Sequence, residues 1–304
     1  MINKIFLPFI SAIIIILLIS CNDSPTDLGT GFLGQDGVEV LKLDSSTDSI
    51  PQFSKPVKKV FSLGSSARLL LGKSDNVKAS TLLHFIFSFD TTITGQIKRN
   101  ELTVLDSWIE LVKDYSFGDS SAAFNYTVHK ITSNWTSSGF TVDSLEFLMR
   151  ESNDVSSFKE TNNDTLYTFH LETDVISSWL HHYADTSIGF NYGLLLSPTD
   201  DTQKVLGFTA YNSSEEDEPL LKIIIKNTDN EIDTVLGYIA SDISVVEGEI
   251  ASVGDENLAI QSSLTSEAKL FFDLSIIPDS TDINYASLTL TVDTLQTKNR
   301  KQFY

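Results

Sequence analysis

The 304-residue chain carries 41 acidic and 21 basic residues, which gives it a formal net charge of −20 at pH 7. A surface with this charge repels phosphate backbones, so we expect no nucleic-acid ligand. The sequence contains a single cysteine. If that cysteine is modified, no thiol remains for a disulfide, a catalytic nucleophile or a thiolate metal site.

Residues 1–20 have the features of a secretory signal. Lys4 precedes an apolar run over residues 5–19, and a small residue, Ser20, ends the segment. This apolar run is shorter than a typical membrane-spanning helix, and it lies very close to the N-terminus. Leu18-Ile19-Ser20-Cys21 resembles the lipobox of bacterial lipoproteins, which implies cleavage before Cys21 and acylation of its sulfur and new amino group. An ordinary secretory signal with a chance cysteine is the alternative.

The lipobox resemblance implies where the protein works. Acyl chains on Cys21 would hold it on a lipid bilayer without crossing it, since each buried methylene contributes about 0.8 kcal/mol. We therefore expect an exported protein that is anchored to a bacterial membrane, at the outer membrane or cell surface. Residues 21–53 are rich in Asp, Ser, Thr, Gly and Pro, a composition that predicts a flexible tether after the lipidated cysteine.

Alternation with a period of two residues dominates the chain from residue 54 onwards. Short runs rich in aromatic and β-branched residues are bounded by Asp, Asn, Ser or Gly, as is typical of strands. These runs lie at 83–89, 124–128, 167–171, 190–196, 206–210 and 221–225. Convincing amphipathic helices are scarce. Many strands without intervening helices predict an all-β fold, an antiparallel β-sandwich over residues 54–226.

The last part of the chain repeats part of this pattern. Residues 270–276 match 83–89 in their apolar positions, and residues 283–290 match 97–104 at nearly the same offset. With a polar run after residue 226, this predicts a linker at 227–242 and an incomplete second β repeat at 243–304. So few strands cannot close a sandwich. They pair with the first domain or with a partner, or the sequence is truncated, which is the interpretation that we favour.

Taken together, these blocks resemble the DNRLRE-type domain, a jelly-roll module of secreted and cell-surface bacterial proteins. The resemblance is carried by Leu71-Gly72, residues 83–89 and 97–104, Val128-His129-Lys130-Ile131 with Trp135, Val175 with Trp179, Asn191-Tyr192-Gly193-Leu194 and Pro219-Leu220-Leu221. The first copy departs from the pattern at Ile86 and Asn100, where the second keeps Asp273 and Ala286. The resemblance implies a jelly-roll β-sandwich related to carbohydrate-binding modules. It supplies no universal set of binding residues, so none is carried over.

Four aromatic residues are candidates for ligand binding: Trp108, Tyr115, Tyr183 and Tyr211. We expect Trp108 past the strand at 102–104 and Tyr115 in a polar loop at 113–121, where aromatic rings suit stacking on pyranose sugars. Two further tryptophans, Trp135 and Trp179, each follow an aliphatic residue by four positions, the spacing of one helical turn. We interpret both as core or lid residues, with sugar stacking as the alternative.

No motif in the sequence selects a metal or catalytic site. His181-His182 with Asp185 lacks the spacing of a zinc site, and three other histidines fall in predicted strands as edge or half-buried side chains: His84, His129 and His170. The acidic pairs and runs Asp200-Asp201 and Glu215-Glu216-Asp217-Glu218 could hold a structural calcium ion, but no ordered oxygen-ligand loop accompanies them. We therefore predict no cofactor and no enzymatic activity.

The sequence favours a non-catalytic, surface-anchored lipoprotein that binds polysaccharide. The alternative is a structural or assembly lipoprotein that docks a protein partner at the cell surface.

Overall fold

The structure is a computed structural model that describes residues 40–58, 66–74, 76–162, 164–211, 217–250, 253, 257–261, 264, 266–279 and 281–294. The predicted signal at 1–20, Cys21 and most of the tether at 21–53 lie outside the described residues. The chain divides into two compact units, residues 53–271 with 282–304, and residues 1–52 with 272–281. The first of these holds the sandwich.

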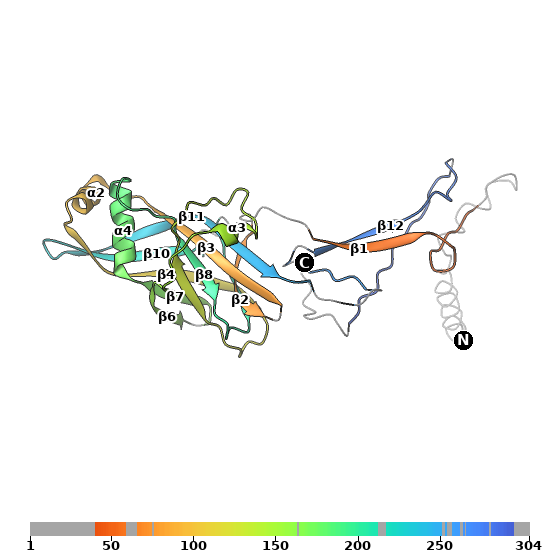
Figure 1. The fold of residues 1–304 in the computed structure, drawn as a ribbon, viewed down its shortest axis with the longest axis horizontal. Coiled ribbons are helices and arrows are strands. Elements are labelled where there is room, and N and C mark those ends of the chain that lie inside the picture. Colours follow the sequence, from red (N-terminus) through yellow and green to blue (C-terminus); the bar gives the residue numbers. More distant parts are fainter. Residues whose placement is uncertain are drawn as a thin grey trace, which may run out of the picture. The chain divides into compact units, whose positions relative to one another are not determined.

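Antiparallel strands dominate the fold, which confirms the prediction of an all-β sandwich (Figure 1). The strands are β1 (Gln52–Lys58), β2 (Arg68–Ser74), β3 (Val77–Phe87), β4 (Leu102–Phe117), β5 (Tyr126–Lys130), β6 (Ser156–Asn162), β7 (Leu166–Leu171), β8 (Leu194–Pro198), β9 (Val205–Thr209), β10 (Leu220–Asn227), β11 (Ile232–Gly248) and β12 (Ser266–Phe272). The helices are α2 (Thr91–Lys98), α3 (Ser144–Phe147) and α4 (Thr173–Ala184).

The sandwich has two layers that share their longest strands. One layer runs β11–β10–β4–β7–β6, each strand antiparallel to the next. The other runs β9–β2–β3–β8–β5. β4 and β11 contribute to both, because β4 pairs with β9 from Lys113 and β11 pairs with β3 from Gly237. A register shift in each strand, which is a β-bulge or similar irregularity, accompanies this change of partner.

Alternate residues of the two layers point inward and form the main core. Ile109 and Phe169 from the first layer, with Phe85 and Phe208 from the second, are fully buried or nearly so. α4 adds Trp179, which is 0% exposed, so the interpretation of Trp179 as a core residue is confirmed. A helix is locally favoured there because its apolar residues recur at helical spacing on one face.

A second, smaller core covers the outer face of the β9–β2–β3–β8–β5 layer. Residues 131–150 pack Ile131, Phe140 and Leu148 against Leu195 and other apolar side chains of that face. Trp135 packs against this cluster, and its Nε1–H donates to the carbonyl oxygen of Tyr192 at 2.7 Å. Trp135 is therefore held as a lid residue, in agreement with the sequence.

The linker predicted at 227–242 is wrong, and so is the domain boundary at 226. Asn227 closes a hairpin, in which its N–H donates to the carbonyl oxygen of Glu231 at 3.0 Å and its Oδ1 accepts from the N–H groups of Asp229 and Glu231. β11 then pairs with β10 and β3, so the sandwich continues to Gly248. The polar run that suggested a linker is a tight turn, where Asn230 adopts a φ of +65°.

The described part of the chain beyond residue 250 contains one strand, β12, which forms a two-stranded sheet with β1. The rings of Phe53 and Phe271 stack there with centroids 4.8 Å apart. Residues 281–293 contain neither helix nor strand, so the strand expected at 283–290 is not formed. The side chains of Ile283, Tyr285, Leu288 and Leu290 are 59–84% exposed. The origin of this segment as a second repeat stays a prediction.

Candidate functional site

The outer face of the β11–β10–β4–β7–β6 layer carries one row of side chains that crosses all five strands. The paired positions are Leu236 on β11, Lys222 on β10, Trp108 on β4, His170 on β7 and Phe158 on β6. We call these five residues the cross-strand row. Trp108 points outward because its neighbour Ile109 points into the core, and successive side chains of a strand alternate between faces.

Three rings of the cross-strand row form a continuous aromatic strip. The rings of Trp108 and His170 stack with centroids 5.7 Å apart and an interplanar angle of 28°. Phe158 lies next to His170, with centroids 5.8 Å apart and the rings tilted by 59°. Phe158 is 58% exposed on the edge strand β6, so this ring offers the most accessible apolar area of the strip.

Carboxylates beside the strip hold its rings in place. The indole Nε1–H of Trp108 donates to Oε1 of Glu110 at 2.9 Å, and Nζ of Lys222 donates to the same oxygen at 2.8 Å. Nδ1 of His170 lies 2.9 Å from Oδ1 of Asp106. The rings are thus ordered before any ligand arrives, which lowers the entropic cost of binding.

A second row of side chains runs parallel to the first on the same face, offset by two residues along each strand. It consists of Tyr238, Leu220, Glu110, Thr168 and Glu160. Tyr238 is 50% exposed. The two rows together place apolar ring area next to carboxylate oxygens. This arrangement suits a ligand with one apolar face and hydroxyl groups at its edges.

Of the four predicted ligand-binding residues, the structure places only Trp108 on the cross-strand row. The loop expected around Trp108 and Tyr115 is wrong, because β4 continues as a strand to Phe117. The Tyr115 ring lies 5.0 Å from the guanidinium carbon of Arg68, and burial raises the pKa of this tyrosine although the arginine opposes the effect.

The two remaining candidates lie elsewhere in the fold. Tyr183 is in α4, where its ring packs against Phe87 and Phe89 and its hydroxyl accepts from the N–H of Phe89 at 3.1 Å. Tyr211 follows β9 and is 41% exposed, and its N–H donates to the Asp242 carboxylate at 2.7 Å. The four residues therefore do not converge on one platform.

Sequence reasoning missed the contribution of His170 and Phe158 to the site. His170 was predicted in a strand as an edge or half-buried residue, and it is half-buried in β7, as His129 is in β5 and His84 in β3. Its alternation with the buried Phe169 indicates that it points outward. No local signal shows that Trp108 is its cross-strand partner, because strand pairing is set by distant segments.

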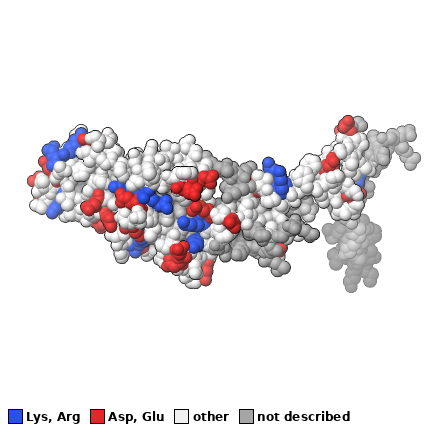
Figure 2. Space-filling model, in the orientation of Figure 1, with Lys and Arg blue, Asp and Glu red and all other residues white. Residues whose placement is uncertain are grey.

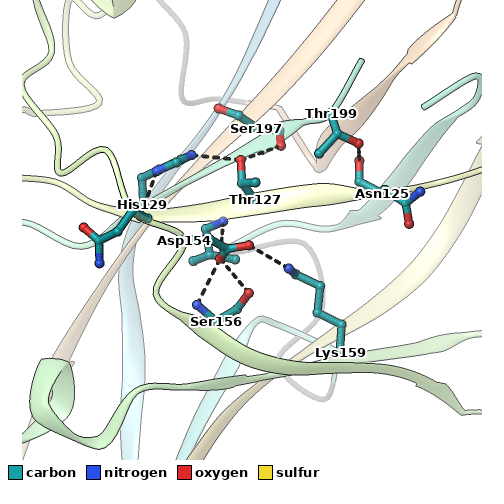
Figure 3. Close-up of polar contacts among 10 residues, drawn as sticks. Asn125, Thr127, His129, Asp154, Ser156, Lys159, Ser197 and Thr199 are labelled. Carbon is teal, nitrogen blue, oxygen red and sulfur yellow. Dashed lines mark hydrogen bonds and ion pairs between the residues drawn. The ribbon is translucent and has the colours of Figure 1, made fainter. Parts of the chain in front are cut away.

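A separate polar cluster joins β5 to the start of β6 (Figure 3). Asp154 accepts from the N–H of Val128 at 3.0 Å, from Oγ of Ser156 at 2.6 Å and from Nζ of Lys159 at 3.0 Å. Burial alone would raise the pKa of Asp154, but these hydrogen bonds hold it below its usual range. Nearby, His129 lies between Oγ1 of Thr127, at 2.8 Å, and a backbone carbonyl. We interpret this cluster as a structural clamp, because its polar atoms bind one another.

The described residues contain no group of three or more His, Cys, Asp or Glu side chains that could hold a metal ion. Of the acidic residues considered for calcium, Asp200 pairs with Lys73 at 3.3 Å and Asp201 accepts from Asn125 at 2.7 Å. Glu215 and Glu216 lie outside the described residues. On the face drawn in Figure 2, Lys and Arg side chains are interspersed among the acidic ones.

Within the described ranges, no helix is long and apolar enough to span a membrane.

Comparisons of this chain with models of known protein families, with curated proteins and with solved structures found no match. The resemblance to the DNRLRE-type domain therefore stays a prediction.

Proposed function

We propose that this protein is a non-catalytic, lipid-anchored module that binds polysaccharide on the cross-strand row. The observation that carries the proposal is the aromatic strip of Trp108, His170 and Phe158, which lies on the outer face of its layer beside hydrogen-bonding side chains. Pyranose rings have an apolar C–H face that stacks on aromatic rings. Their hydroxyl groups bond to carboxylate and hydroxyl oxygens at the rim.

The carboxylates of this face support a binding role better than a catalytic one. Hydrolysis of a glycosidic bond needs two carboxylates, one of which keeps a proton because its pKa is raised. Asp106 and Glu110 instead accept hydrogen bonds from His170, Trp108 and Lys222. Both carboxylates therefore already serve as hydrogen-bond acceptors within the fold.

Anchoring by lipid would compensate for weak binding at a single site. The proposed acyl chains on Cys21 would display many copies on one membrane. A long polysaccharide could then engage several copies at once, and the overall avidity exceeds that of each site. Labelling with radioactive palmitate tests the anchor. We expect the label on the wild-type protein and its loss, with release from the membrane fraction, in Cys21→Ser.

Affinity electrophoresis in gels that contain neutral polysaccharides tests the binding function. Phe158→Ala removes the most exposed ring of the strip and is expected to weaken retention about five- to tenfold, since ring burial of this extent contributes about 1–1.5 kcal/mol. Trp108→Ala is expected to abolish retention. Phe147→Ala is the matched control, because Phe147 is an exposed ring on α3, in the segment that covers the other layer. Equal retention of all four proteins would contradict the proposal.

A second function, docking of a protein partner, is favoured by a different observation. The apolar side chains of Ile86 and Tyr238, which pair across β3 and β11, are each 50% exposed and extend the second row. Apolar area of this kind also suits a protein interface. Cross-linking in intact membranes followed by mass spectrometry separates the two functions. A stable protein partner, with no retention by any polysaccharide, would replace the first proposal.

A further inference from the structure

The geometry of the aromatic strip gives the ligand a direction. Its rings sit on β4, β7 and β6 at one level, so the strip runs across the strands and not along them. Neighbouring strands are about 4.8 Å apart, so the distance from Lys222 to Phe158 across three gaps is about 14 Å. A ligand that covers the cross-strand row from Lys222 to Phe158 is therefore an extended chain of several sugar units.

The charges around the strip indicate which chains it accepts. Three carboxylates, Asp106, Glu110 and Glu160, lie on or beside the two rows. Among the side chains of these rows, Lys222 supplies the ammonium group, and it already pairs with Glu110 at 2.8 Å. On these rows a polymer of uronic acids or sulfated sugars would therefore meet three carboxylates and one ammonium group, an excess of negative charge that disfavours its binding.

The carboxylates also keep acceptor capacity for a neutral ligand. Both hydrogen bonds that Asp106 accepts from the protein end on its Oδ1 atom. Both hydrogen bonds that Glu110 accepts end on its Oε1 atom. The second oxygen of each group can accept from a sugar hydroxyl. The same oxygen atoms that repel an anionic polymer therefore bind the hydroxyl groups of a neutral one.

We infer that the cross-strand row binds one neutral polysaccharide chain laid across β10, β4, β7 and β6, and that its carboxylates exclude anionic polysaccharides. This inference rests on the proposed function. It adds the chemical class of the ligand and its orientation. Selectivity arises because the strip provides stacking for any pyranose, whereas the carboxylates admit only chains without negative charge.

Calorimetry on the mature chain at low salt tests the inference. Neutral oligosaccharides of increasing length, from gluco-, manno- and xylo-series, are expected to bind more tightly until they span the cross-strand row from Lys222 to Phe158, after which affinity is constant. The neutral polymers are expected to bind at least tenfold more tightly than polygalacturonate or alginate. Glu160→Lys replaces a carboxylate of the second row with an ammonium group and is expected to narrow this difference in affinity at least threefold. Glu146→Lys, on the exposed face of α3, is the charge-matched control and is expected to leave the difference unchanged.

The outcomes separate the inference from the proposed function. Polygalacturonate binding as tight as that of the neutral polymers, or a monosaccharide that binds as tightly as the longest oligosaccharide, overturns the inference and leaves polysaccharide binding in place. If Glu160→Lys leaves the difference in affinity between neutral and anionic polymers unchanged, the carboxylates do not select the ligand. No heat with any glycan overturns the proposed function and this inference together.

Discussion

Removal of β11 is expected to unfold the sandwich. A chain of residues 22–226 ends where the sequence predicted the domain boundary, whereas residues 22–250 retain β11. Within β11, Val235, Ile239, Ile243 and Val245 are 0–8% exposed. Full burial of such a side chain contributes about 1.5–3 kcal/mol, so their loss costs about 6–12 kcal/mol. That figure is an upper estimate, but it is comparable with the whole stability of a domain, about 5–15 kcal/mol.

The backbone adds to this loss. β11 pairs with β10 on one side and with β3 on the other, so its removal leaves both strands with unpaired edges. Far-UV circular dichroism and urea denaturation of residues 22–226, 22–250 and 22–304 provide the measurement. We expect a cooperative transition for the two longer chains and none for the shortest. If residues 22–226 unfold cooperatively at the same urea concentration as residues 22–250, the assignment of β11 to the sandwich is refuted.

Three substitutions and one control substitution test other features of the fold by urea denaturation. Gly193→Ala is expected to cost about 3 kcal/mol or more, because Gly193 has a φ of +82° and an added Cβ would lie 2.1 Å from the Leu83 carbonyl oxygen. Gly139→Ala is its control, with a φ of +77° and no atom within 4 Å of the new Cβ, and about 1–2 kcal/mol is expected. Ser107→Ala is expected to keep stability or raise it by up to about 1 kcal/mol, since the buried Ser107 hydroxyl has no hydrogen-bond partner among the described residues, and a clear loss would contradict this. Asp154→Asn is expected to cost about 1 kcal/mol at pH 7. Because the pKa of Asp154 is lowered in the folded state, its contribution is present above the unfolded pKa and disappears as the pH falls through the folded one; a difference from wild type that persists at low pH would contradict this account.

Local sequence patterns were sufficient to predict the elements that depend on local physics. Alternation with buried Phe85, Phe169 and Phe208 predicted strands, and the helical spacing of Val175 and Trp179 predicted a helical turn. These patterns report which side of an element faces the core. They carry no information on which strands become neighbours, because pairing joins segments far apart in the chain.

The errors of the sequence analysis arise from this non-local pairing. The polar run at 227–231 has the composition of a linker, and only the pairing of β11 with β10 and β3 identifies it as a hairpin turn. Likewise, the polar residues around Tyr115 resemble a loop, but pairing with β9 keeps β4 extended to Phe117. Trp108 was found as a candidate from its polar neighbours, whereas His170 and Phe158 become its partners only through the register of β4, β7 and β6.

The same alternation that builds the core makes the proposed site separable from it. On β4 and β7, the residues that stabilise the sandwich are Ile109, Leu111 and Phe169, and the residues of the aromatic strip point the other way. A substitution at the exposed Phe158 therefore removes area available to a ligand while leaving the core packing unchanged, and surface changes of this kind shift stability by about 0.5 kcal/mol or less. Loss of glycan retention in Phe158→Ala with an unchanged urea midpoint would thus report on the binding surface itself. A parallel loss of stability would instead assign the ring a structural role.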